Sequence, residues 1–324
     1  MQSDSYILVI GGTNMDIGAR PFGPLLPHDS LPGTVRRTPG GVGRNIAHNL
    51  ALLGLDTGLV TVLGDDVAAG KITASCGELG IDLSRALRLT GASTSTYLYI
   101  TGPDGDLALA VSDMDLCDRL TPEVLAPRLD WLNRAQALVV DANIPEASID
   151  WLCRHAGVPV FADPVSVTKA EKLRSLLGRI DTLKPNRLEA EALSGIPITD
   201  EASLNRAADV LLETGLRRLF LTLGAGGLLA ADGHQRLRLQ APPGKPVNTT
   251  GCGDAFTAAL VWARLQGADL EESALAGQAA SAIAMESADA FHSAMSAEAL
   301  QAGIRTLSES RPRPTPGTAK PIDT

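Results

Sequence analysis

Aromatic side chains are scarce in this chain of 324 residues: they make up 3% of it, including three tyrosines and three tryptophans. Acidic residues outnumber basic ones by 37 to 28, which gives a net charge of −9. Proteins that grip a nucleic-acid strand need basic grooves and aromatic platforms for the bases. The composition therefore argues against a nucleic-acid polymer as partner. It leaves small anions open, because the amides at a helix start bind phosphate locally.

Cysteine and long apolar runs are also in short supply. The four cysteines are scattered, with no C-x-x-C pair, which argues against a disulfide scaffold or a structural zinc site and favours a reducing compartment. The first apolar run, Tyr6–Ile10, is too short for a signal peptide or a membrane span. These absences predict a cytoplasmic protein without a membrane partner.

What the chain does have is a regular alternation of short apolar runs and amphipathic stretches. The runs expected to be buried strands are Tyr6–Ile10, Gly58–Leu63, Ala137–Val140, Val158–Ala162 and Arg218–Leu223. The stretches expected to be helices are Asn45–Leu53, Ala147–His155, Leu188–Ser194 and Ala202–Glu213. This alternation predicts an α/β fold with a mostly parallel sheet that is covered on both faces.

Two parts of the chain depart from that rhythm. Ser95–Ile100 and Leu107–Val111 flank a turn-rich linker and predict an antiparallel hairpin, either a flap over a site or a surface hairpin that could pair in a homodimer. After Asn248 the pattern becomes almost entirely helical. The expected helices there are Gly253–Leu265, Leu270–Glu286 and Ala297–Leu307, and the proline-rich residues 308–324 are expected to be disordered.

The sharpest local signal is the run Asn248-Thr-Thr-Gly-Cys-Gly-Asp254, which leads into a long apolar helix. Its glycines let the backbone approach a ligand, and the first-turn amides with the helix dipole form an anion hole. Asp254 lies in that turn, where its carboxylate could accept a proton from an attacking hydroxyl. An equally weighted alternative is that Thr250 or Asp254 only caps the helix.

Other glycine-rich or polar motifs are weaker. Gly64–Ile72 differs from a P-loop in its glycine spacing and in lacking Ser or Thr at the end, and no complete dinucleotide fingerprint or zinc-protease motif is present. Asn186 and Glu189 have the spacing of a capping box, which spacing alone favours over an outer-shell Mg²⁺ site. Asp16 follows the first strand and Asn45 opens a helix, so both could bind sugar hydroxyls, although such residues usually satisfy turns.

In their order along the chain, Gly40–Asn45, the Asn186/Glu189 pair and Asn248–Asp254 resemble the signatures of the ribokinase-like, PfkB-type carbohydrate kinases. The resemblance covers about residues 5–305. It implies one three-layer α/β/α domain over residues 1–307, with a mostly parallel central sheet and a small β lid formed around 12–38 and 93–115.

The same resemblance implies ATP-dependent phosphorylation of a primary hydroxyl on a sugar or nucleoside. Asp254 would be the general base, with the amides of Gly251, Cys252 and Gly253 stabilising the phosphoryl charge, and Asn186 and Glu189 would organise Mg²⁺. The residues implied to bind ATP are Asn186, Thr222, Gly224, Gly226 and Gln278. Those implied to bind the acceptor are Asn14, Asp16, Gly41, Asn45, Ser112, Asp113 and Asn143.

Within that family the segments Gly11–Ile17, Pro39–Ala47 and Ala110–Asp115 are similar to those of kinases that phosphorylate the 5′-hydroxyl of pseudouridine. Ser112 and Asp113 would then reach the base, unless they are only the solvated end of a hairpin. Another sugar or nucleoside kinase and a catalytically silent binding protein remain the alternatives. The carboxylate of Asp254 speaks against the silent protein.

Three positions depart from the family pattern. Asn248 stands where many relatives have Asp at a monovalent-cation position, so potassium activation is left open. Cys252 replaces the usual Ala, but its amide is unaffected. Asn143 occupies a position that is acidic in ribokinases, which favours an acceptor other than free ribose.

Overall fold

The computed structural model describes residues 5–242, 248–287 and 292–309. Its largest feature is an eight-stranded sheet with six neighbouring parallel strands and, at one edge, two further strands added by antiparallel pairing. The strands, in spatial order, are β14 (Arg236–Leu239), β13 (Leu228–Asp232), β12 (Arg218–Thr222), β11 (Thr182–Leu183), β10 (Val160–Asp163), β9 (Ala137–Asp141), β1 (Ile7–Ile10) and β4 (Thr57–Val60). The predicted parallel sheet is confirmed.

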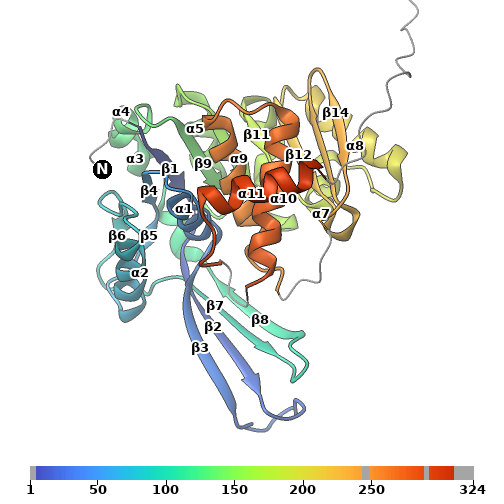
Figure 1. Ribbon diagram of the computed structural model, residues 1–324. Coiled ribbons are helices and arrows are strands. Elements are labelled where there is room, and N and C mark those ends of the chain that lie inside the picture. Colours follow the sequence, from blue (N-terminus) through green and yellow to red (C-terminus); the bar gives the residue numbers. More distant parts are fainter. Residues whose placement is uncertain (1–4, 243–247, 288–291, 310–324) are drawn as a thin grey trace, which may run out of the picture.

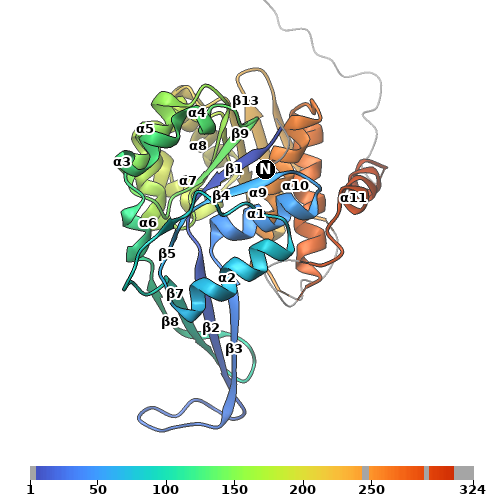
Figure 2. The ribbon, with the colours of Figure 1, turned by 90° about the vertical axis from the view of Figure 1, so that its left-hand side faces the viewer.

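Helices cover both faces of this sheet (Figures 1 and 2). One layer consists of α1 (Val42–Leu52), α2 (Val67–Glu78), α9 (Cys252–Leu265), α10 (Leu270–Met285) and α11 (Ala297–Glu309). The other consists of α3 (Pro122–Leu125), α4 (Leu129–Leu132), α5 (Glu146–His155), α6 (Val167–Ala170), α7 (Arg187–Ser194) and α8 (Glu201–Glu213), with short 3₁₀ turns between some of them.

The two layers explain why the strands read as unbroken apolar runs. Along β1, Ile7 and Val9 belong to the core under the α9–α10 layer, whereas Leu8 and Ile10 belong to the core on the opposite face. Successive side chains of a strand point to opposite faces, so a strand covered on both sides needs apolar residues at every position. All five predicted buried strands are confirmed for this reason.

A second, smaller sheet projects from the body of the molecule (Figure 1). Its order is β3 (Gly33–Gly40), β2 (Asn14–Pro21), β7 (Thr96–Thr101) and β8 (Leu107–Asp113). The predicted hairpin is β7–β8, and β2 and β3 form a second antiparallel pair joined to it through parallel β2 and β7. We call these four strands the small sheet.

The helical C-terminal part is also confirmed, and α11 continues to Glu309. Residues 310–324, most of the segment expected to be disordered, lie outside the described residues. The predicted strand Gly58–Leu63 is divided between β4 and β5 (Val62–Leu63), which belong to different sheets. Helix α2, strands β13 and β14 and strand β6 (Leu87–Arg88), the partner of β5, were not predicted. None of the helices among the described residues is long and apolar enough to cross a lipid bilayer.

Candidate active site

Charged side chains gather where the parallel strands of the large sheet end. Asp141 is the last residue of β9, Asp163 is the last residue of β10, and Lys184 follows β11. All three are buried. Because parallel strands present their carboxyl ends at one edge, residues far apart in sequence meet there, which is where open α/β sheets bind ligands.

The start of α9 faces this edge. Its geometry shows whether Thr250 or Asp254 acts only as a helix cap. Gly251 is the N-cap, in a left-handed conformation with φ of 80°, and no side chain caps the helix. Within the described residues, no acceptor is bonded to the amides of Gly253 and Asp254, whereas Cys252 N donates to Thr249 O over 3.4 Å. The alternative in which Asp254 or Thr250 caps this helix is therefore wrong. The amides of Gly253, one of the predicted anion-hole residues, and of Asp254 are therefore available to an anion, whereas that of Cys252 is already bonded.

The Asp254 carboxylate is held from across the molecule. Its Oδ2 accepts a hydrogen bond of 2.9 Å from Asn45 Nδ2, which lies on α1 and 209 residues away in sequence. Burial raises the pKa of Asp254 to about 8, with the nearby charge of Asp163 acting in the same direction and the Asn45 bond and Lys184 opposing it. A carboxylate in this environment is a much stronger base than one in water.

A buried ion pair beside α9 contains functional candidates that the sequence reasoning missed. Lys184 Nζ lies 3.0 Å from Asp163 Oδ2, and the Thr257 hydroxyl donates to the same oxygen over 3.1 Å. A methyl group placed on Gly253 would lie 2.8 Å from Lys184 Nζ, so the ammonium is packed against the first turn of α9. Lys184 was visible only as the residue before Pro185, since its partner comes from another strand.

The start of α7 carries the Asn186/Glu189 pair and forms the capping box that its spacing predicts. Glu189 N donates to Asn186 Oδ1 over 3.0 Å, and Asn186 N donates to Glu189 Oε2 over 2.9 Å. Thr222, at the end of β12, lies beside Asn186 and donates its amide to Pro185 O over 2.9 Å. The structure thus brings Asn186, Glu189 and Thr222 together.

The donor set at α7 fits a hydrated Mg²⁺ ion better than a fully protein-ligated one. The described residues contain no group of three or more His, Cys, Asp or Glu side chains that could hold a metal. Glu189 is buried, burial raises its pKa, and its Oε1 makes no hydrogen bond among the described side chains. Mg²⁺ commonly keeps several waters and takes one or two carboxylates together with substrate phosphates.

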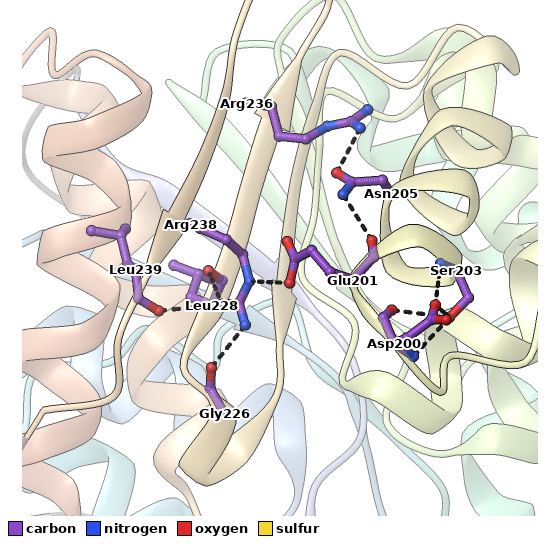
Figure 3. Close-up of polar contacts among 9 residues, drawn as sticks. All are labelled: Asp200, Glu201, Ser203, Asn205, Gly226, Leu228, Arg236, Arg238 and Leu239. Atoms are coloured by element: carbon purple, nitrogen blue, oxygen red, sulfur yellow. Dashed lines mark hydrogen bonds and ion pairs between the residues drawn. The ribbon is translucent and has the colours of Figure 1, made fainter.

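Hydrogen bonds from one arginine hold the glycine-rich loop at residues 224–227, which follows β12 (Figure 3). Arg238, on β14, donates to Gly226 O over 3.1 Å and to Leu228 O over 2.9 Å, and its Nε lies 3.3 Å from Glu201 Oε2 on α8. Gly224 begins this loop with φ of 56°. Gln278, on α10, is buried and donates its side-chain amide to Gln240 O over 2.8 Å.

The predicted acceptor residues Asn14, Asp16 and Gly41 lie together where β2 and β3 leave the body. Asn14 Nδ2 donates to Asp16 Oδ1 over 2.6 Å, and burial raises the pKa of Asp16. Gly41 has φ of 98° and passes so close to Gly12 that a side chain at position 41 would meet its carbonyl oxygen at 2.6 Å. Glycine is required at this crossing, since it alone tolerates both the conformation and the contact.

Asn143 lies on the other side of the β1 end. Its Oδ1 accepts a hydrogen bond of 2.5 Å from Lys169 Nζ, and its backbone N–H donates to Asp141 Oδ1 over 2.9 Å. Asp141 Oδ2 in turn accepts from Gly12 N over 2.8 Å. The neutral side chain at position 143 therefore has a cation as its partner.

The small sheet divides the last two predicted acceptor residues between its faces. Asp16 pairs with Tyr97, and Tyr97 with Ser112, so these three lie in one row on one face. Asp113 is the next residue of β8 and points to the opposite face. Tyr99, two residues beyond Tyr97, shares the face of Asp16. The rings of Tyr97 and Tyr99 have centroids 5.7 Å apart and planes tilted by 32°. This tyrosine pair was not singled out from the sequence.

Comparisons with known proteins agree with this geometry. The sequence profile of the pfkB family of carbohydrate kinases matches residues 4–296. The pseudouridine kinase of Escherichia coli (strain K12) is 37% identical over 287 residues, covering 88% of this chain and 92% of that protein. An uncharacterised sugar kinase of the same organism is 38% identical over 301 residues, covering 92% of this chain and 83% of the relative.

Solved structures lead to the same family. The ribokinase of Arabidopsis thaliana complexed with ribose and ATP superposes with a TM-score of 0.83 at 25% identity, covering 93% of this chain and 98% of that one. The chain belongs to the pfkB family of carbohydrate kinases. It is a phosphotransferase with an alcohol group as acceptor, and its acceptor is a sugar or a nucleoside.

The raised pKa of Asp254 makes stability depend on pH. Between an unfolded value of 3.8 and a folded value of about 8, the folded protein holds a proton that the unfolded chain has lost. The stability linked to this group is therefore fully present below pH 3.8 and is lost as the pH rises towards 8. We expect the free energy of unfolding to fall more steeply over this range in the wild-type protein than in Asp254→Asn. Urea unfolding of both proteins at several fixed pH values measures the difference, and parallel curves would contradict it.

Proposed function

We propose that this protein transfers the γ-phosphoryl group of ATP to the 5′-hydroxyl of pseudouridine, giving pseudouridine 5′-phosphate and ADP. The observation that carries the proposal is the position of the Asp254 carboxylate on the same helical turn as the unbonded amides of Gly253 and Asp254. A base and an anion site on one helical turn serve a hydroxyl that loses its proton while it attacks a phosphoryl group. The relative that is 37% identical, named a pseudouridine kinase, supports the choice of acceptor.

The proposed step follows from the contacts of Asp254. Asn45 occupies Oδ2, which leaves Oδ1 to accept the hydroxyl proton. As the oxygen–phosphorus bond to the nucleoside forms, the bond from phosphorus to the bridging oxygen of ADP breaks and the proton stays on Asp254. The amides of Gly253 and Asp254 receive the negative charge of the transferring group. Asn186 and Glu189 would hold the waters of a Mg²⁺ ion, which supplies positive charge to the phosphates when bound.

The tyrosine pair of the small sheet supports a nucleoside in preference to a free pentose. Tyr97 is adjacent to Asp16 across the β2–β7 pair, and Tyr99 lies over Gly18, where a methyl group would come within 2.5 Å of the ring. The two rings therefore follow one another along β7 on the face of Asp16, and Tyr99 lies beyond the predicted sugar ligand. A free pentose held at Asp16 would leave both rings uncovered, whereas the base of a nucleoside can stack on them. Base–aromatic stacking is an established source of affinity.

Replacing the proposed base tests the chemistry. Asp254→Asn keeps the shape and the bond to Asn45 but cannot take a proton, so kcat should fall by about 10²–10⁴-fold. Affinity for the nucleoside, measured by calorimetry, should survive. Turnover close to the wild-type level would remove Asp254 from the mechanism.

The acceptor is identified by ATP consumption with Mg²⁺ and a panel of pseudouridine, uridine, other nucleosides, ribose and fructose. Pseudouridine should give the highest kcat/KM. If a free sugar gives a higher kcat/KM, the protein is still a kinase but pseudouridine is not its acceptor. If no compound in the panel is phosphorylated, the result favours a silent binding protein. Repeating the assay with potassium shows whether Asn248 has removed the response to a monovalent cation.

The role of the tyrosines can be separated from that of the sugar site. Tyr97→Ala should raise KM for pseudouridine by about 5- to 150-fold, as expected for loss of a stacked base worth ~1–3 kcal/mol, and leave any ribose activity unchanged. Tyr97→Phe, which keeps the ring, should behave like the wild type. Phe22→Ala removes an aromatic that is 74% exposed at the far end of β2 and is the matched control. An equal loss with ribose and pseudouridine would contradict base stacking.

We also propose that the protein is a homodimer joined through the small sheet. The face opposite Asp16 carries Val35, Leu98, Leu109 and Val111, which are 57%, 38%, 58% and 58% exposed. Apolar patches of this kind mark interaction surfaces, and a four-stranded sheet offers one to a second copy. Sedimentation equilibrium should give twice 33.7 kDa for the wild type and 33.7 kDa for Val111→Glu. A monomeric wild type would overturn the proposal.

A further inference from the structure

Lys184 is placed where a lysine would not be expected for stability alone. Its side chain is 9% exposed, and its ammonium is packed against Gly253 in the first turn of α9. The N-terminal end of a helix is the positive end of its dipole, which disfavours a cation and favours an anion. The ammonium is thus close to amides that themselves await a negative group.

The ion pair with Asp163 accounts for only part of its bonding capacity. An ammonium has three N–H donors. Within the described residues its hydrogen-bonded acceptor is Asp163 Oδ2, and that oxygen is shared with the hydroxyl of Thr257. Burial works to lower the pKa of Lys184, but Asp163, Glu189 and Asp254 outweigh it and raise that pKa, so the lysine is charged. Donors therefore remain for a ligand at the start of α9.

The position of Lys184 in the chain also places it near the residues proposed to organise Mg²⁺ and the phosphates of ATP. Lys184 is followed by Pro185 and by Asn186, the N-cap of α7. The ammonium packs against the first turn of α9, and its charge also interacts with that of Glu189 in the first turn of α7. A cation beside the unbonded first-turn amides of α9 is an arrangement that binds an oxyanion in a protein interior.

We propose that Lys184 is a catalytic residue that donates hydrogen bonds to an oxygen of the transferring phosphoryl group, and that Asp163 is the residue that positions it. The phosphoryl group leaves ADP and joins the acceptor oxygen while the acceptor proton goes to Asp254. Lys184 stays protonated throughout and gives up no proton. This inference rests on the kinase activity of the family and not on which nucleoside is the acceptor.

The competing explanation is that Lys184 only neutralises the buried charge of Asp163. A buried pair is damaged most when one partner is removed, whereas removal of both is often tolerated. The test therefore compares Lys184→Met, Asp163→Asn and the double variant, with Lys71→Met on the exposed face of α2 as the matched control. Each is assayed with the best acceptor found in the substrate panel, so a wrong nucleoside does not affect the outcome.

We expect Lys184→Met to lower kcat by about 10²–10³-fold with little change in KM for the acceptor, and Lys71→Met to have no effect. The double variant, which removes both partners of the buried ion pair and should fold even where Lys184→Met does not, is expected to be as slow as Lys184→Met. Recovery of the double variant to the kcat of Asp163→Asn would overturn the proposal.

A second readout does not depend on turnover. Wild-type enzyme with acceptor, ADP, Mg²⁺ and aluminium fluoride, which imitates the transferring phosphoryl group, should form a tight complex measurable by calorimetry. Lys184→Met should lose this tightening yet still bind ADP and acceptor separately. An unchanged aluminium fluoride complex in Lys184→Met would show that the ammonium does not contact the phosphoryl group.

Discussion

The buried carboxylate of Asp163 is the interaction on which the geometry of the site depends. Its Oδ2 is bonded to Lys184 after β11 and to Thr257 on α9, and its Oδ1 accepts the amide of Val165 over 2.9 Å. One side chain thus fixes two strand ends and the helix that carries Asp254. Val165 has φ of 67°, a conformation that costs free energy for a β-branched residue and persists only where the surroundings impose it.

Features that depend on local spacing could be predicted from the sequence, and features that depend on strand order could not. The apolar run at 6–10, the capping box at Asn186 and the glycine-rich start of α9 are each specified within about ten residues. Asn45 and Asp254 meet only because α1 packs against α9. Likewise, the partnership of Asp163 and Lys184 requires β10 and β11 to be neighbours, which no spacing in the sequence indicates.

The small sheet shows a different limit. Strand β2 contains Gly18 and ends at Pro21, and most of β3 is exposed and polar, so neither has the apolar alternation that marks a strand packed on a core. Their register still decides which side chains share a face. Tyr97 and Tyr99 are obvious as a pair in the sequence, but their relation to Asp16 follows only from the parallel pairing of β2 and β7.

Structural and functional roles coincide at several of these residues. Asn186 and Glu189 complete a helix start and, by doing so, hold an amide oxygen and a carboxylate in fixed positions before any ligand arrives. A fixed charge near a reaction centre needs no reorganisation when the transition state forms. For this reason the capping interpretation and the magnesium interpretation do not exclude one another.

The charges of the buried side chains affect how the phosphates of ATP can approach the acceptor in the proposed reaction. Asp254, Asp163 and Glu189 surround Lys184, and three carboxylates would repel the phosphates of ATP if all were ionised and unpaired. Asp163 is paired with Lys184, and burial raises the pKa values of Asp254 and Glu189, because several ionised carboxylates are unfavourable in this space. In the proposed step Asp254 gains its proton as the phosphoryl group approaches the acceptor oxygen. The carboxylate next to the arriving group therefore becomes neutral at the stage when repulsion would otherwise be greatest.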